Sequence, residues 1–209
     1  MKLNTVLVKV KLINFGRFQN EEFIIDGSTF IMGQNRQGKT MCLDALLYLL
    51  TGSRQFNKAA GNKIENGGRT LEDYTLGDAN EETGPLRKAP VITYIIIEWY
   101  SPAEKKYFLL GVCINTNKNK AFNEKTWFQF NDCRMDDISF VKEDKYFIPF
   151  NLEELTLPDG KKPDNSNMFR KVKDGIANIM KTLQIDGSIS EWRDHILLMD
   201  AFKPNEIKG

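Results

Sequence analysis

The residues best suited to chemistry in this chain form one stretch, Gly33-Gln34-Asn35-Arg36-Gln37-Gly38-Lys39-Thr40. Two glycines with four residues between them, followed by a lysine and a hydroxyl residue, are the pattern of a phosphate-binding loop. Glycine lets successive backbone N–H groups point at phosphate oxygens. Lys39 can reach the β- and γ-phosphates, and the Thr40 hydroxyl is placed to ligate Mg²⁺. The stretch predicts nucleotide binding, and we include Met41 among the cofactor-binding residues.

The elements on both sides of the loop fit this interpretation. Thr29-Phe30-Ile31-Met32 is a short apolar run entered through an Asp26-Gly27 turn, and it predicts a buried strand. Residues 41–50 are apolar almost all round and are followed by Gly52, which predicts a buried helix whose N-terminus faces the phosphates. The alternative is a chance match on a glycine turn before a core helix; the two flanks favour nucleotide binding.

Composition sets the broad class. The chain has 209 residues, with 41% apolar and 27% charged residues, which is typical of a globular protein with one substantial core. A net charge of +1 gives no global argument for DNA or membrane binding. We see no signal pattern and no apolar run of about 18 residues, so we expect a cytoplasmic protein with no membrane partner. The three cysteines lack metal-ligand spacing, and the single histidine, His195, excludes a His-cluster zinc site.

The N-terminal part predicts a β-hairpin followed by the loop and a long connection. Residues 5–15 alternate as a strand does, and a second strand is expected at Glu22–Ile25. Residues 53–90 are polar and glycine-rich, and we expect them to be irregular. Four basic residues in this connection are candidate DNA or phosphate contacts, although a solvated loop explains them equally well: Arg54, Lys58, Lys63 and Arg69.

The middle of the chain predicts an antiparallel β-meander over residues 91–150. Strands are expected at 91–100, 106–115 and 126–130, with a fourth at 145–150. Aromatic residues in these strands suit packing in the sheet core better than a base-stacking platform: Trp99, Tyr107, Trp127 and Phe130.

Helices are expected towards the C-terminus, over residues 167–200. Apolar residues recur at helical spacing from Phe169 to Leu183, and Ser188-Ile189-Ser190-Glu191 is a capping-box pattern that opens a last helix. The basic outer face of the first helix is better explained by solvation than by DNA contact. The fold class is therefore α/β with α+β character, with a mixed sheet and an antiparallel meander around the loop helix.

Part of a hydrolytic site is missing from the sequence. ATP hydrolysis needs a carboxylate that helps to hold Mg²⁺ and a group that orients water. The nearest candidate is Ile196-Leu197-Leu198-Met199-Asp200, but Ala201 follows it where a catalytic Glu is expected, and the run lies in a helical pattern. We reject it as a Walker B segment, and we find no LSGG-like signature. The chain alone is therefore expected to be inactive, with no catalytic residue of its own.

These features together resemble a known family. A first strand ending in Asn14-Phe15-Gly16-Arg17-Phe18, the hairpin, and the loop followed by Met41-Cys42-Leu43-Asp44-Ala45-Leu46 resemble the N-terminal half of an SMC-type ABC ATPase head. Residues 56–60, 69–77 and 201–204 resemble the MukB/MksB-like branch, closest to the JetC-type SMC subunits of Wadjet anti-plasmid systems. One departure is Arg36-Gln37, where the family has glycine and a small residue; these positions vary in the general pattern, so binding should survive.

The resemblance implies a composite ATPase. Residues 1–209 would be the N-terminal lobe of a head, followed by a coiled coil and a C-terminal half that supplies the signature and Walker B segments. Two heads would form a homodimer that sandwiches ATP and Mg²⁺, and ATP hydrolysis would drive extrusion of double-stranded DNA in the nucleoid. Further implied partners are a kleisin, a winged-helix subunit and a toprim nuclease subunit. Arg17 would contact a nucleotide phosphate, as a basic residue after the first strand does in some relatives.

Two other interpretations remain open. One is a RecF-like or break-repair SMC-like ATPase head, which differs in partners more than in chemistry. The other is a stand-alone nucleotide-binding module that never hydrolyses ATP.

Overall fold

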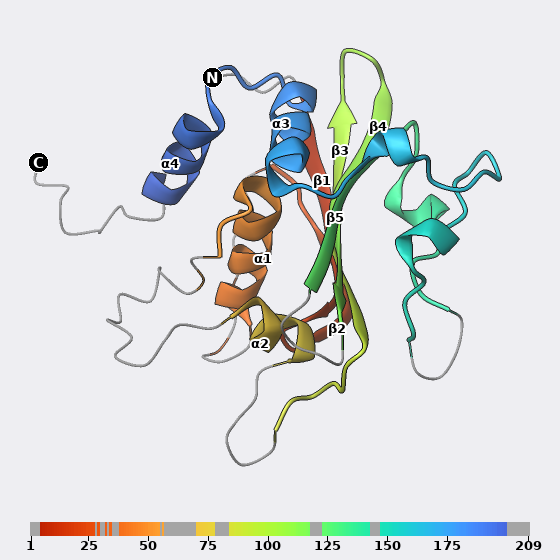
Figure 1. The fold of residues 1–209 in the computed structure, drawn as a ribbon. Coiled ribbons are helices and arrows are strands. Elements are labelled where there is room, and N and C mark those ends of the chain that lie inside the picture. Colours follow the sequence, from red (N-terminus) through yellow and green to blue (C-terminus); the bar gives the residue numbers. More distant parts are fainter. Residues whose placement is uncertain are drawn as a thin grey trace, which may run out of the picture.

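The computed structural model describes residues 5–27, 29, 32, 34, 38–54, 56, 70–77, 84–117, 123–142 and 147–199. A six-stranded sheet in the order β2-β1-β3-β4-β5-β6 runs through the molecule (Figure 1). All five strand pairings are antiparallel. The strands are β1 (Val6–Phe15), β2 (Phe18–Ile24), β3 (Val91–Ser101), β4 (Lys106–Thr116), β5 (Asn123–Asn131) and β6 (Met168–Phe169).

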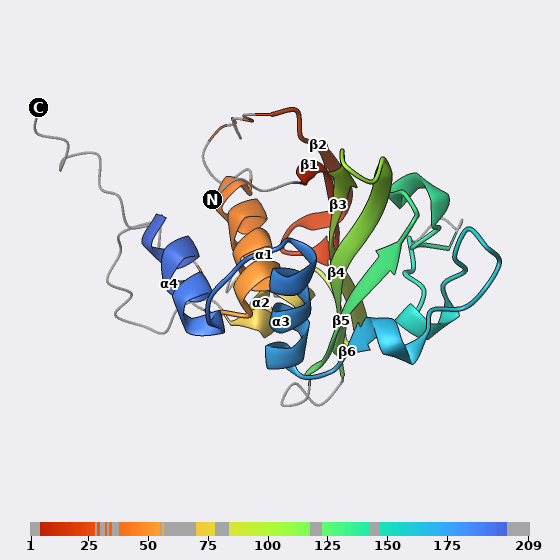
Figure 2. The same ribbon diagram turned by 90° about the horizontal axis from the view of Figure 1, so that it is seen from above.

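Helices cover one face of this sheet. They are α1 (Lys39–Thr51), α2 (Leu71–Leu76), α3 (Val172–Thr182) and α4 (Ile189–Met199). The segment between β5 and β6 covers the other face, and it holds the 3-10 turns Met135–Asp137, Leu152–Glu154 and Asn165–Asn167 (Figure 2). None of the helices in the described ranges has the length and apolar character needed to cross a bilayer.

Strand alternation divides the interior into two apolar cores. On β3, Ile95 and Ile97 belong to the core beneath α1 and α3, whereas Tyr94 and Ile96 belong to the core on the opposite face. Because successive side chains point to opposite faces, a strand buried on both sides has no polar alternation, which explains the nearly continuous apolar run of β3. Trp127 on β5 fills the first core and is 1% exposed.

The C-terminal end of α1 is held by hydrogen bonds from distant parts of the chain. The backbone N–H of Gly52 donates to Tyr48 O. The indole N–H of Trp127 donates to Leu49 O at 3.0 Å. The indole N–H of Trp192 donates to Leu50 O at 2.8 Å, and Arg193 Nε donates to Thr51 O at 2.6 Å. The last four carbonyls of α1, which have no partner within a helix, are thus all satisfied, and α4 is joined to α1.

The predicted α/β class, the three main strands of the meander and the C-terminal helices are confirmed. The parallel neighbour that a mixed sheet requires is not among the described strands. The fourth strand predicted at 145–150 is wrong where the chain is described: Phe147 has φ 49°, which breaks an extended run, and Pro149 forms only an isolated bridge with Val141. The sixth strand is instead Met168–Phe169, which the sequence pattern had assigned to a helix.

One helix was missed in the connection expected to be irregular. Helix α2 begins at a capping box in which Asp73 N donates to Thr70 Oγ1 and Thr70 N donates to Asp73 Oδ2. At six residues it is too short to show a helical period, so only the Thr70-to-Asp73 spacing could have indicated it.

Candidate functional site

The N-terminus of α1 is built around Gly38. This residue has φ 95°, a left-handed conformation that L side chains rarely adopt, and it lies directly before the helix. A Cβ at Gly38 would lie 2.8 Å from Cζ of Phe18, so the ring of Phe18 closes the space that a side chain would need. Two features therefore favour glycine at this position of the predicted loop: the left-handed dihedral angle and the close packing against Phe18.

The first backbone N–H groups of α1 lie before its hydrogen-bond ladder. The first intrahelical hydrogen bond runs from Cys42 N to Gly38 O at 3.0 Å. The N–H groups of Lys39, Thr40 and Met41 precede it, and they have no acceptor within the helix. The first turn carries no acidic residue, so within the described residues no carboxylate of the helix itself competes there. An anion is favoured at such a helix end.

The Lys39 side chain folds back over the loop. Its ammonium group donates to the carbonyl oxygen of Gln34 at 2.8 Å, which brings the positive charge next to the loop backbone. Thr40 is the second residue of α1 and is half-buried. Gly33, Asn35, Arg36 and Gln37 lie outside the described residues, so the structure places Gln34, Gly38, Lys39, Thr40 and Met41 of the predicted site.

The predicted strand in front of the loop is not found where the chain is described. Thr29 and Met32 are not in a strand, and Met32 is 88% exposed, which contradicts burial of that side chain. Phe30 and Ile31 lie outside the described residues. An apolar run indicates that a segment packs against another surface. No described part of the chain provides that surface for Met32.

A buried polar contact attaches helix α1 to helix α2. Asp44 is 4% exposed and accepts a hydrogen bond from the Tyr74 hydroxyl of α2. The Tyr74 ring stacks on Phe15 of β1, with ring centroids 4.7 Å apart and planes at 15°. Asp44 therefore joins α1 to α2 and β1, which is a structural role.

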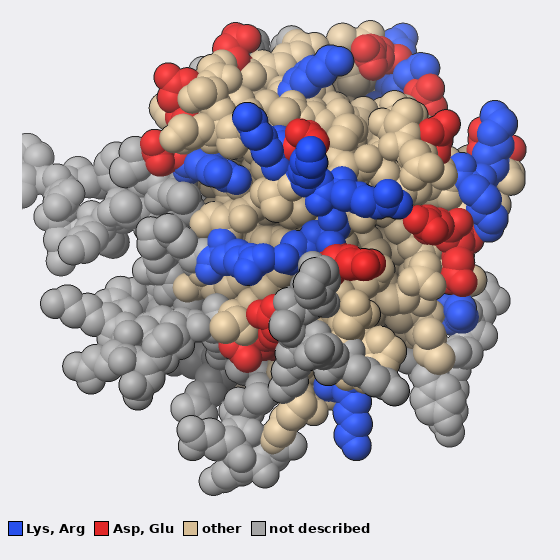
Figure 3. Space-filling view, viewed as in Figure 1, with Lys and Arg blue, Asp and Glu red and all other residues tan. Residues whose placement is uncertain are grey.

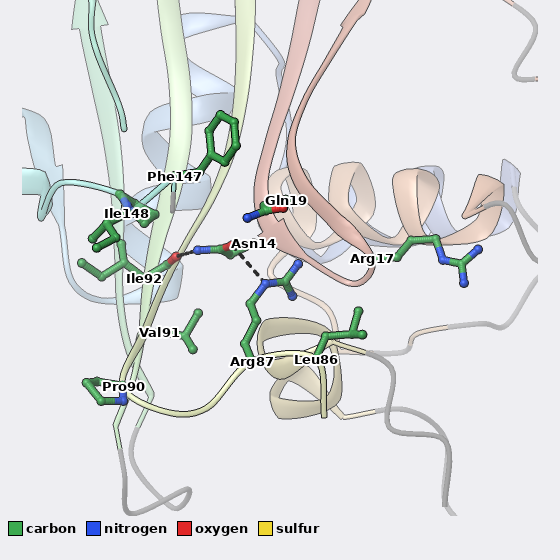
Figure 4. Close-up of a pocket in the computed structure, with 11 residues that line it drawn as sticks. Asn14, Arg17, Gln19, Leu86, Arg87, Pro90, Val91, Ile92, Phe147 and Ile148 are labelled. Carbon is green, nitrogen blue, oxygen red and sulfur yellow. Dashed lines mark hydrogen bonds between the residues drawn. The ribbon is translucent and has the colours of Figure 1, made fainter. Parts of the chain in front are cut away.

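The turn between β1 and β2 lies against the start of α1. Asn14 and Gly16 have φ 53° and 56°, and a Cβ at Gly16 would lie 2.6 Å from Sδ of Met41. Phe18, at the far end of the turn, contacts Gly38. Arg17 is exposed between these two contacts, and its side chain is directed away from Asn14 and Arg87 (Figure 4). The predicted phosphate contact Arg17 is thus carried by a turn that touches the loop helix.

Arg87 holds this turn, and sequence reasoning missed it. Its Nε donates to Asn14 Oδ1 at 3.0 Å, Nη1 to Gly16 O at 2.8 Å, and Nη2 to Phe18 O at 2.8 Å. Burial lowers the pKa of the guanidinium to about 10. The residues that it joins are about 70 positions away in the sequence, and no local pattern marks such a contact.

A pocket of about 470 Å³ lies beside the turn, but no described residue of the phosphate loop lines it. Asn14, Gln19 and Arg87 contribute polar groups to its wall (Figure 4). Leu86 and Phe147 contribute exposed apolar side chains. Arg17 also lines this pocket, but the guanidinium of Arg87 is engaged by backbone carbonyls of the turn. The backbone N–H groups and the dipole of α1 make its N-terminus the better candidate for phosphate.

The predicted DNA-contact residues are only partly placed. Arg54 is exposed after α1, whereas Lys58, Lys63 and Arg69 lie outside the described residues. Burial, and then the charge of Arg54, lower the pKa of Lys125 on β5, so two basic groups are neighbours here. Figure 3 shows Lys and Arg side chains gathered on the face that carries α3 and β5. The exposed basic residues around α3 are Arg170, Lys171, Lys173 and Lys181.

Other kinds of site find no support in the described part of the chain. It holds no group of three or more His, Cys, Asp or Glu residues that could bind a metal ion. The three cysteines are buried and form no disulfide. Burial raises the pKa of the Cys42 thiol to about 11. Residues 196–199 belong to α4, which agrees with rejecting them as a Walker B strand, and Asp200 lies outside the described residues.

Comparison with known proteins supports the nucleotide interpretation. Residues 7–63 match the family described as the P-loop containing region of AAA domain. A search of the curated proteins found no significant match to the chain. The matched region includes nearly all of β1, and β2, the loop at 33–40 and α1. It supports a P-loop NTPase, and therefore a site for a nucleotide and, as is usual for such loops, Mg²⁺.

Proposed function

We propose that this chain is the ATP-binding half of an SMC-type ATPase head. The observation that carries nucleotide binding is the geometry at the start of α1. Gly38 is left-handed and closed off by Phe18, the next three N–H groups lie ahead of the helix ladder, and Lys39 folds over the loop. Together these features suit a phosphate, because the helix N-terminus presents backbone N–H groups and Lys39 adds a positive charge beside them.

The residues present fit a nucleotide with Mg²⁺. The N–H groups at 39–41 would bind phosphate oxygens, Lys39 would neutralise phosphate charge, and the Thr40 hydroxyl would ligate the metal. Mg²⁺, when bound, neutralises charge that develops on the phosphates. The carboxylate of α1, Asp44, is engaged by Tyr74, so α1 itself offers no group to orient water. In this proposal, hydrolysis belongs to a composite site.

The SMC assignment rests on the resemblance of the sequence, and the fold is compatible with it. The turn 14–18 lies against the loop helix, an antiparallel meander follows, and the described part of the chain ends with α3 and α4. In the complete protein, a coiled coil would follow and the C-terminal half of the head would supply the signature and Walker B segments. That half would also offer a surface for Met32, which is exposed here.

In this proposal the complete head pairs with a second copy through two bound ATP molecules. ATP hydrolysis drives extrusion of double-stranded DNA in the cytoplasm, on the nucleoid. The Wadjet form would add a kleisin, a winged-helix subunit and a toprim nuclease. A RecF-like or break-repair head shares the same nucleotide chemistry, and genes for a kleisin and a toprim protein beside this one would distinguish Wadjet from repair.

Titration of the 209-residue chain with a fluorescent ATP analogue and Mg²⁺ tests the loop. We expect weak binding, above the submicromolar range, because half of the contacts are supplied elsewhere. Lys39→Ala should abolish it. Lys181→Ala is the matched control, since Lys181 is exposed on α3, and it should bind as the parent does. Binding unchanged in Lys39→Ala contradicts the loop assignment.

The gene downstream of residue 209 tests the SMC part of the proposal. Several hundred residues of heptad repeats, followed by a signature segment and a Walker B segment, would support a head half. A stop codon at that point would leave the stand-alone module as the better reading, even if the loop binds ATP.

A further inference from the structure

We propose that Arg87 is a positioning residue for the nucleotide site. It fixes the β1–β2 turn, residues 14–18, against the first turn of α1, and so determines where Arg17 lies relative to the phosphate loop. This inference rests on the nucleotide binding proposed above. It assigns a role to a residue that lies outside the loop and outside the region matched by the P-loop family.

The hydrogen bonds of Arg87 bracket Arg17. Nη1 donates to the carbonyl of Gly16 and Nη2 to the carbonyl of Phe18, both at 2.8 Å, so the two acceptors belong to the residues immediately before and after Arg17. The planar guanidinium fixes both carbonyls in one geometry, which a single ammonium group does not do. The backbone at Arg17 is therefore defined from both sides by one side chain.

The same two residues contact the start of α1. Gly16 packs on the Met41 side chain, and Phe18 packs on Gly38. A Cβ added at Gly16 would lie 2.6 Å from Met41 Sδ, and one added at Gly38 would lie 2.8 Å from Phe18 Cζ. These contacts pack the turn directly against the first turn of the helix. A shift of the turn thus moves Arg17 and disturbs the packing of Gly38 together.

Other hydrogen bonds hold Arg87 itself in place. Its backbone N–H donates to Leu76 O at 2.8 Å, and Nε donates to Asn14 Oδ1 at 3.0 Å. Asn14 in turn donates from Nδ2 to Ile92 O at 3.0 Å. Arg87 therefore connects α2 and the start of β3 to the turn. The turn takes its position from the scaffold, in which Phe15 of the turn is also buried against Tyr74.

A double-mutant cycle with Arg17 tests this role. The full chain would be titrated with the fluorescent ATP analogue and Mg²⁺ at low temperature, as the parent, Arg87→Gln, Arg17→Gln and the double variant. We expect Arg87→Gln to weaken binding by about fivefold or more when Arg17 is present, and by about twofold in the Arg17→Gln background. A purely structural role predicts the same loss in both backgrounds, and that result overturns the proposal.

A matched control separates positioning from stability. Arg193 is also half-buried and donates to a backbone carbonyl of the loop helix, but at its C-terminal end. Arg193→Gln should lower the melting temperature and leave the dissociation constant within about twofold. Should Arg87→Gln fail to fold, Arg87→Lys replaces it in the double-mutant cycle. Lysine keeps the positive charge but cannot donate to the Gly16 and Phe18 carbonyls in the planar geometry of a guanidinium.

The outcomes also separate this inference from the proposed function. If the parent binds, Lys39→Ala does not, and Arg87→Gln binds as tightly as the parent, then only the positioning role of Arg87 is overturned. If the parent shows no Mg²⁺-dependent nucleotide binding, the proposed function fails and this inference falls with it.

Discussion

At the scale of single residues, Gly38 carries the strongest constraint in the site. It combines a left-handed backbone with a contact that excludes a Cβ. We expect Gly38→Ala to lower the free energy of unfolding by about 1–3 kcal/mol and to abolish nucleotide binding, because both the dihedral angle and the packing against Phe18 are violated. Urea unfolding and the nucleotide titration measure the two effects.

Gly160→Ala is the matched control for Gly38. Gly160 has φ 78° but no atom within 4 Å of the position of a Cβ, so its substitution adds dihedral strain alone. We expect a loss of about 1 kcal/mol and unchanged nucleotide binding. Equal losses in the two variants would contradict the packing argument for Gly38.

Two tryptophans of the sheet, Trp127 on β5 and Trp99 on β3, provide a second contrast between residues. The indole N–H of Trp127 satisfies Leu49 O, whereas the N–H of Trp99 is buried and has no hydrogen-bond partner among the described residues. Trp127→Phe should cost about 1–3 kcal/mol beyond the loss of size, because it leaves a buried carbonyl unpaired. Trp99→Phe should cost clearly less, since it removes an unpaired donor. Urea unfolding compares the variants, and equal costs would contradict this account of the α1 terminus.

At the scale of elements, one charge cluster joins the edge of the sheet to the segment behind it. Lys11 of β1 contacts Glu22 of β2 at 2.5 Å, directly opposite in the register, and Lys9 contacts Glu22 at 3.4 Å and Asp136 at 2.7 Å. Burial raises the pKa of Glu22, but Lys11 and Lys9 outweigh it and hold that pKa below its usual value. Lys9 lowers the pKa of Asp136 against a smaller effect of burial.

These shifts set the sign of a pH dependence. A carboxyl whose pKa is lower in the folded state contributes stability above its unfolded pKa and loses it as the pH falls through the folded pKa. We expect Glu22→Gln to cost about 0.5 kcal/mol at pH 7, because the group is partly solvated, and to reduce the loss of stability below about pH 4.5. Glu153→Gln, at an exposed ion pair with Arg170, should change neither quantity. Urea unfolding from pH 3 to 7 tests both.

The sequence predicts local elements better than their contacts. Helices α1 and α4 could be predicted because the glycines at either end of α1 and the capping box before α4 are adjacent to the residues that they affect. The pairing of β6 with β5 and the bonds of Arg87 depend on packing between distant segments, which no local pattern contains. Pro149 was a local sign against the fourth strand, since proline weakens a strand assignment.

At the scale of the whole molecule, the proposed function places phosphate binding and the chemistry of hydrolysis in different parts of the complete protein. Lys39 lies beside the backbone of Gln34 at the start of a well-packed helix, and the carboxylate of that helix, Asp44, is engaged by Tyr74. We expect the 209-residue chain with saturating ATP and Mg²⁺ to release phosphate no faster than Lys39→Ala does, measured by a coupled phosphate assay. A Lys39-dependent rate from the chain alone would show that it contains a complete site. A rate that appears only when the proposed C-terminal half of the head is added would assign the missing carboxylate to that half.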